Sequence, residues 1–280
     1  MTIAAESKAR RAAARWPASL ILGGTIVTAW LAIALVGPFL SPHDPIAVDI
    51  AHALLPPSSE FPLGTDSFGR DVLTRIMYGA RVDLQMAFFG VVGPFIIGTT
   101  IGLVAGNYGG RLDTVLMRLL DVTVSFPYFV LVIAIVAVLE PGLTSYYISL
   151  TLVNWVSYAR LVRSEVMVWR AADFVLAART IGISERRIMA RHLLPNVISP
   201  AVVFIFTDAV LTIVLGSSLG FLGLGVQPPT AEWGVMIAEG QLYLAAAWWI
   251  SVFPGLSISL LALGFSLIAD GLAKVLHTSP

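Results

Sequence analysis

The sequence predicts an all-α integral membrane protein, and three observations lead to this fold class. Of its 280 residues, 57% are hydrophobic and only 12% are charged, whereas soluble domains carry about 25% charged residues. Several apolar stretches are long enough to cross the roughly 30 Å hydrocarbon core of a bilayer, which takes about 20 helical residues. No alternating pattern of about ten residues recurs, so the spans are expected to be helices.

Six stretches are expected to form membrane-spanning helices within one transmembrane domain, residues 16–280. The domain follows a basic N-terminal tail, residues 1–15. Two polar segments, residues 41–81 and 222–247, interrupt the apolar sequence and contain most of the prolines outside the spans. The expected spans are residues 16–36, 83–106, 113–138, 146–164, 197–221 and 248–270.

The distribution of Lys and Arg predicts the orientation, because cytoplasmic loops are enriched in basic residues. If the N-terminus is cytoplasmic, 14 of the 17 Lys and Arg residues lie on the cytoplasmic side. The other three, Arg70, Arg75 and Arg81, lie in the segment 41–81. We therefore expect a multi-pass protein of the cell inner membrane with both termini in the cytoplasm and with residues 41–81 and 222–247 outside.

The long cytoplasmic segment, residues 165–196, is too polar for lipid and too long for a hairpin. Its composition predicts two short helices, Asp173 to Arg179 and Ser184 to Leu194, with Gly182 between them. Helical spacing gives the first helix an exposed apolar stripe: Phe174, Ala177, Ala178 and Ile181. Such a segment either lies on the bilayer surface, as basic amphipathic helices do, or docks against a partner protein.

The spacing within this segment resembles the EAA loop of ABC-importer permeases. That motif is Glu-Ala-Ala, three residues, Gly, nine residues, Ile, one residue and Leu-Pro; here Leu176 replaces the glutamate and His192 the isoleucine. The resemblance implies a coupling helix that docks into a groove on an ATP-binding subunit. The residues expected to serve this coupling are Asp173, Leu176, Ala177, Ala178, Arg179, Gly182, Glu185, Arg186, Arg187, Leu194 and Pro195.

Further motifs resemble the DppC/OppC-type permeases of dipeptide and oligopeptide importers, and they follow one another along almost the whole chain. Gly216 departs from the pattern, because such permeases usually carry an acidic residue there. The matching segments are Pro62 to Asp66, Gly69 to Asp71, Tyr78 to Arg81, Ala105 to Gly110, Tyr158 to Arg163, Arg191 to Asn196, Phe221 to Pro229, Phe253 to Gly255 and Asp270 to Leu272.

The resemblance implies an assembly of several proteins. A second permease of the same fold would complete the pore, two ATP-binding subunits would use ATP and Mg, and an extracytoplasmic binding protein would deliver the substrate. The chain itself is expected to catalyse no reaction and to bind no cofactor and no nucleic acid. Di- and oligopeptides are the expected substrates, and nickel, opines or another small solute are alternatives for the same architecture.

The residues themselves contain no recognisable catalytic or metal-binding set. The four histidines are scattered and lack the i, i+4 spacing of metal ligands on one helix. Within the spans, Asn154 and Asp208 are functional candidates, because exposing an ionised aspartate to lipid costs about 2.5–3.5 kcal/mol or more. These two residues either line the pore or hydrogen bond between helices inside the bundle.

Three glycines in the second expected span predict close helix packing. Gly98, Gly102 and Gly106 are spaced by four residues, so they share one helix face and let another backbone approach. The partner helix would belong either to the same bundle or to the second permease.

The outer segment from Phe61 to Arg81 is expected to hold a helix lying along the outer membrane surface or against the mouth of the bundle. We expect Asp66, Arg70 and Asp71 to form an outer-face site, with Arg70 and Asp71 directed toward water or toward a docked binding protein. A local ion pair between Asp71 and Arg75 is the alternative.

A secondary transporter driven by an ion gradient is the main rival function. Such proteins often carry internal repeats and broken helices around ion sites at the middle of the membrane. One long basic loop, few charges within the spans and no visible repeat fit that class poorly. A purely structural membrane scaffold would not need the spacing found in the loop.

Overall fold

The computed structural model describes residues 16–277, and the regular structure in that range is helical apart from an isolated bridge between Thr65 and Asp71. The basic tail, residues 1–15, lies outside the described residues. The helices are α2 Ala18–Leu40, α3 Val72–Tyr108, α4 Gly110–Val124, α5 Tyr128–Leu139, α6 Leu143–Trp169, α7 Asp173–Thr180, α8 Glu185–Ile188, α9 Leu194–Phe221, α10 Trp233–Gly240 and α11 Trp249–His277, with short 3₁₀ turns at Ile50–His52 and Gln241–Tyr243 and a π turn at Met189–Leu193.

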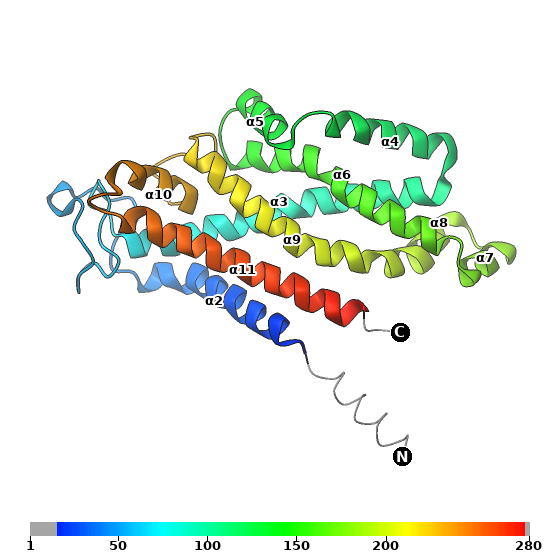
Figure 1. The fold of residues 1–280 in the computed structure, drawn as a ribbon, viewed down its shortest axis with the longest axis horizontal. Helices are drawn as coiled ribbons and strands as arrows, with labels where there is room; N and C mark the ends of the chain where they lie inside the picture. The colour runs from blue at the N-terminus through cyan, green and yellow to red at the C-terminus, as the bar shows by residue number, and fades with distance from the viewer. Residues whose placement is uncertain (1–15, 278–280) are drawn as a thin grey trace, which may run out of the picture.

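The long helices lie side by side along one axis of the molecule (Figure 1). One end holds the segment between α2 and α3 together with α10, and the other end holds α7 and α8. Helix α2 begins and α11 ends at the end that holds α7. The two ends are therefore built from different parts of the chain, as the expected alternation of outer and cytoplasmic segments requires.

Four described helices are long and apolar enough to cross a membrane, or five if the pair α4 and α5 counts as one broken span. The expected span 113–138 is wrong as a single helix, because α4 and α5 meet at 86°. The break falls at residues 125–127, where Pro127 cannot donate a helical hydrogen bond. Helix α6 is long enough to cross a membrane but is less apolar than the four helices counted above. The count of six spans therefore stays a prediction.

The three spaced glycines bring α3 against α6, and this is the most extensive contact between two helices of the bundle. A Cβ at Gly98 would lie 2.6 Å from the Cβ of Tyr158, and one at Gly106 would lie 2.8 Å from the Cβ of Val166. Both distances are shorter than side chains tolerate, so only glycine permits this approach. The predicted close packing is confirmed, and its partner is a helix of the same chain.

Arg81 on α3 compensates for the proline inside α2. Pro38 has no N–H to donate to the carbonyl of Ala34, one turn earlier. The Nε of Arg81 donates to that carbonyl oxygen at 2.5 Å, and the guanidinium lies 5.7 Å from the ring centre of Tyr78. Arg81 is one of three basic residues in a segment that is otherwise predicted to be poor in Lys and Arg. Its role here is to bind the carbonyl group that Pro38 leaves without a helical donor.

Candidate functional site

The segment expected to couple to a partner forms a compact helical cap at one end of the bundle. Helix α7 confirms the first predicted helix, and Gly182 follows it with φ +82°, a conformation that L side chains rarely adopt. The second predicted helix begins at Glu185, but Leu194 does not end it. It continues through the π turn into α9, so that Glu185–Phe221 is one long helix.

Pro195 is the second residue of α9, which follows the π turn Met189–Leu193 directly. Leu194 is half-buried and Pro195 is exposed. A displacement of α8 would therefore be transmitted directly to the membrane-spanning helix α9.

The residues of the expected apolar stripe of α7 lie on two faces, and the expectation that Ala178 is exposed is wrong. Ala178 is only 5% exposed and packs with Val175 against Val166 and Ile188 inside the chain. It cannot be a contact for a partner surface. The side chains that face outward are Phe174, Leu176, Ala177 and Ile181, of which Ile181 is 76% exposed.

Three polar side chains fix this cap to the end of α3. The Nε of Arg179 donates to Glu185 Oε1 at 3.0 Å, and its Nη2 donates to Asn107 Oδ1 at 3.0 Å. Asn107 in turn donates to Glu185 Oε2 at 2.9 Å. These charge-assisted bonds join α7, α8 and α3. Asp173, Arg186 and Arg187 remain exposed.

Asp208 and Asn154 meet inside the bundle. Asp208 on α9 is buried, and its carboxylate accepts hydrogen bonds from Asn154 Nδ2 at 3.2 Å and from the hydroxyl of Tyr158 at 2.9 Å. Both donors lie on α6, so the predicted hydrogen bonding between helices is present. Asn154 also lines a cavity of about 330 Å³ at the break between α4 and α5, together with Tyr128 and Ser157.

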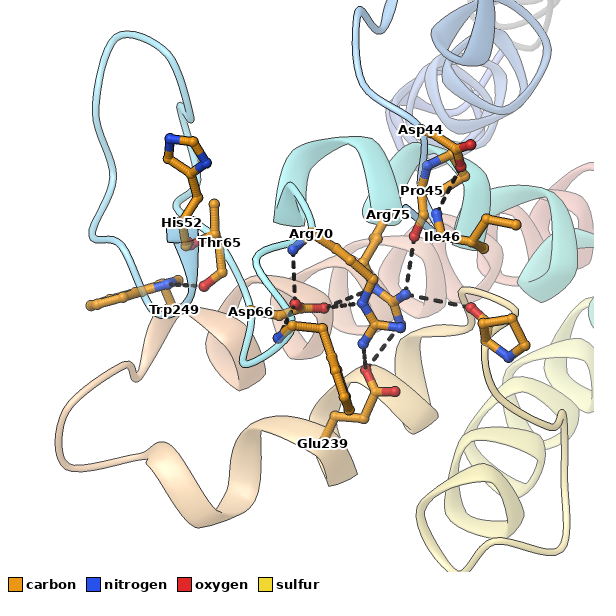
Figure 2. A network of polar contacts seen from close by, with 12 residues as sticks. Asp44, Pro45, Ile46, His52, Thr65, Asp66, Arg70, Arg75, Glu239 and Trp249 are labelled. Atoms are coloured by element: carbon orange, nitrogen blue, oxygen red, sulfur yellow. Dashed lines mark hydrogen bonds and ion pairs between the residues drawn. The ribbon is translucent and has the colours of Figure 1, made fainter. Parts of the chain in front are cut away.

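The residues expected at the outer face form a buried charged cluster instead of a solvated patch (Figure 2). Asp66, Arg70 and Arg75 are each at most 4% exposed. Arg70 Nε donates to Asp66 Oδ2 at 2.6 Å, and Arg75 Nε lies 3.5 Å from the same oxygen. Glu239 at the end of α10 accepts from Arg70 at 2.8 Å and from Arg75 at 2.9 Å.

The expectation that Arg70 and Asp71 face water or a docked protein is therefore wrong, because the segment folds inward to neutralise its charges. Asp71 is buried and caps α3, accepting from the backbone N–H of Thr74 at 2.9 Å. The separate surface helix is also wrong, since Val72 and the residues after it form the first turns of α3. The alternative pair is not formed either: Arg75 binds Asp66 and Glu239 instead of Asp71.

Backbone packing holds the cluster in place. Gly69 has φ +75°, and a Cβ there would collide with the carbonyl of Asp49. The indole of Trp249, at the start of α11, donates to the carbonyl of Thr65 at 3.1 Å. Arg75 Nη1 also donates to the carbonyls of Pro45 and Pro229, at 3.2 and 3.4 Å. The cluster thus joins the segment before α3 to residues 229–249, far away in the sequence.

Sequence reasoning missed three acidic residues at this end: Glu239, Asp83 and Glu232. Each lies in or beside an apolar helix, and nothing nearby in the sequence marks its partner. Gly216, where an acidic residue was expected, lies against Met86 and Tyr146, and a Cβ there would require the Met86 side chain to shift. The adjacent Ser217 hydrogen bonds to Glu232 at 3.4 Å, so an acid from the following segment occupies this neighbourhood.

A bundle of apolar helices with a helical cap fixed to one end and a buried charged cluster at the other defines the subunit of a membrane permease. The profile of the family described as "Binding-protein-dependent transport system inner membrane component" matches residues 98–279, and the chain belongs to this family of ABC-transporter permeases, which are non-catalytic pore subunits.

Relatives by sequence match almost the whole chain. The dipeptide transport system permease protein DppC of Alkalihalophilus pseudofirmus is 42% identical over 91% of this chain and 84% of its own length. DppC of Bacillus subtilis is 39% identical over 92% and 81%. A solved structure of the MetNI methionine ABC transporter, in an inward-facing conformation, covers 72% of this chain and 95% of its own chain with a TM-score of 0.59 at 17% identity, and supports the fold.

Proposed function

We propose that this chain is half of the pore of an ATP-driven, binding-protein-dependent importer, and that the cap formed by α7 and α8 docks on an ATP-binding subunit. The observation that carries this proposal is the attachment of the cap. Its outer face is apolar and exposed among the described residues 16–277, while the bonds of Arg179, Glu185 and Asn107 fix it to α3. A force applied at Ile181 would reach α3 through Asn107 and α9 through α8.

The proposed partners are a second permease of the same fold, two ATP-binding subunits that use ATP with Mg, and an extracytoplasmic binding protein. Di- and oligopeptides are the proposed substrates, because the relatives described above are named as dipeptide permeases. Nickel, opines or another small solute remain the alternative cargo of the same architecture. Asn154 and the cavity it lines are the proposed contact of this chain with the translocated solute.

Substrate class is best tested on the binding protein that delivers it. A ligand that binds the native state raises apparent stability by mass action, by about 2.7 kcal/mol at a hundredfold excess over Kd. We expect dipeptides and short oligopeptides to raise the unfolding temperature of the binding protein encoded beside this chain. Stabilisation by a nickel chelate or an opine, with no response to peptides, would show that the substrate is that solute and not a peptide.

We further propose that both termini and the cap face the cytoplasm, with residues 41–81 and 222–247 outside. The chain has no cysteine, so single variants can be labelled without background. Ser58→Cys, Thr230→Cys and Ser184→Cys replace residues that are exposed in the chain. A membrane-impermeant thiol reagent should label the first two variants in intact spheroplasts and should reach Ser184→Cys only after lysis. Labelling of position 184 alone would invert the topology.

A further inference from the structure

Two carboxyl groups lie together in the interior, one from Asp83 on α3 and one from Glu232 just before α10. Neither side chain is exposed to any degree, at 0% each. Glu232 caps α10, accepting from the N–H of Gly234 at 2.7 Å and from that of Val235 at 2.8 Å. Asp83 Oδ2 accepts from the N–H of Trp233 at 3.3 Å. Both carboxyls therefore hold the first turn of α10.

No positive charge among residues 16–277 forms an ion pair with these two carboxyls. The nearest arginines on α3 are directed elsewhere, Arg75 toward Glu239 and Arg81 toward the carbonyl of Ala34. The groups that face the pair from other helices are neutral: Tyr146 and Tyr147 on α6 and Ser217 on α9.

One oxygen of the pair has no donor if both groups are ionised. Asp83 Oδ1 is buried without a hydrogen-bond partner, and the two carboxyls lie beside each other because they accept from the N–H groups of consecutive residues 233, 234 and 235. Ionised carboxylates only accept hydrogen bonds, so a bond between the two forms only when one of them carries a proton. Adjacent buried carboxylates do not both ionise readily. Burial also raises the pKa of Glu232, which favours its neutral form.

We propose that Asp83 and Glu232 form a proton-binding site, in which one shared proton joins the two carboxyl groups and fastens α10 to α3. Helix α10 also carries Glu239 of the charged cluster and packs against α9 and α11. The proton thus secures a short helix on which the structure of this end depends.

The direction of the pH dependence follows from proton counting. With α10 in place the pair binds a proton that separate, hydrated carboxyls release near their ordinary pKa of about 4. The attachment of α10 is therefore strongest in acid and weakens as the pH rises above that value, by up to about tenfold in its equilibrium constant per pH unit, until the pair itself has lost the proton.

The accessibility of position 235 measures this attachment. Val235 is 4% exposed on the first turn of α10, and the chain contains no other thiol to react. The full chain carrying Val235→Cys is labelled in isolated membranes, with both faces open to a small methanethiosulfonate reagent, from about pH 5.5 to about pH 8.5. Rates are divided by those of Thr230→Cys, which is exposed and reports the intrinsic reactivity of the thiol.

We expect the relative labelling rate of Val235→Cys to rise severalfold with pH, and Asp83→Asn to abolish that rise. The asparagine amide donates to Glu232 at every pH and so replaces the proton permanently. If Asp83→Asn does not insert into the membrane, Asp83→Ala removes one carboxyl of the pair, leaves the cap of α10 by Glu232 in place, and should likewise abolish the rise. A rate that is independent of pH with both carboxyls present, or one that rises equally in the Asp83 variants, would overturn the proposal.

Discussion

Replacing Ile181 by aspartate should uncouple ATP hydrolysis from transport while the chain remains folded in the membrane. Ile181 is 76% exposed within the chain, and substitutions at such positions change stability by about 0.5 kcal/mol or less. At a docking surface, however, an apolar residue near the centre contributes about 2 kcal/mol or more, roughly thirtyfold in affinity. We expect loss of substrate-stimulated ATPase activity and of uptake in the reconstituted complex.

Two matched variants distinguish docking from a general effect of charge. Ile181→Leu keeps an apolar side chain and should retain coupling. Thr180→Asp places the same charge at the adjacent exposed position and should also retain coupling if the apolar contact of Ile181, and not charge in general, is what matters. If α7 instead lies on the bilayer surface, Ile181→Asp would leave stimulated ATPase activity intact. The same result in a properly assembled complex would contradict the docking role.

Replacing Arg75 by methionine should cause the largest loss of stability of any single change at the end of the bundle that holds α10. Arg75 is 1% exposed, and its removal leaves Asp66 and Glu239 to share the single guanidinium of Arg70. Breaking a buried ion pair by removing one partner typically costs about 3–5 kcal/mol, because the remaining charge is buried without compensation. The measurement is thermal unfolding of the purified complex in detergent.

Arg75→Lys is the matched control for this prediction. Lysine keeps the charge but lacks the planar fork that reaches Asp66, Glu239 and two carbonyl oxygens at once, so an intermediate loss is expected. By the same argument, Arg70→Glu should unfold the outer segment and not simply weaken the docking of a binding protein. An unfolding temperature of Arg75→Met equal to that of the unaltered chain would show that the cluster does not stabilise the fold.

The apolar helices and the first helix of the cap were predictable because their signals are local. Hydropathy located long apolar helices, the spacing of Gly98, Gly102 and Gly106 indicated a close helix contact, and Gly182 separated the two helices of the cap. Pro127 in the sequence indicates a break between α4 and α5, but hydropathy alone does not detect a bend within an apolar stretch.

The remaining features were not predictable because they depend on pairs of residues far apart in the chain. Arg75 and Glu239 are 164 residues apart, and neither segment alone indicates that its charge is neutralised. Polarity alone therefore predicted that Arg70 and Asp71 are directed toward water or toward a docked binding protein. Helical periodicity placed Phe174 and Ala178 on one stripe of α7, whereas packing against α6 and α8 turns Ala178 inward.

The most direct test of the proposed function is uptake of a labelled dipeptide by proteoliposomes that contain this chain, the second permease, both ATP-binding subunits and the binding protein. Uptake should require ATP on the side of the ATP-binding subunits, should stop when Ile181→Asp replaces the unaltered chain, and should be indifferent to an imposed proton or sodium gradient. Uptake that proceeds without ATP and follows an ion gradient would contradict the account and would identify a secondary transporter.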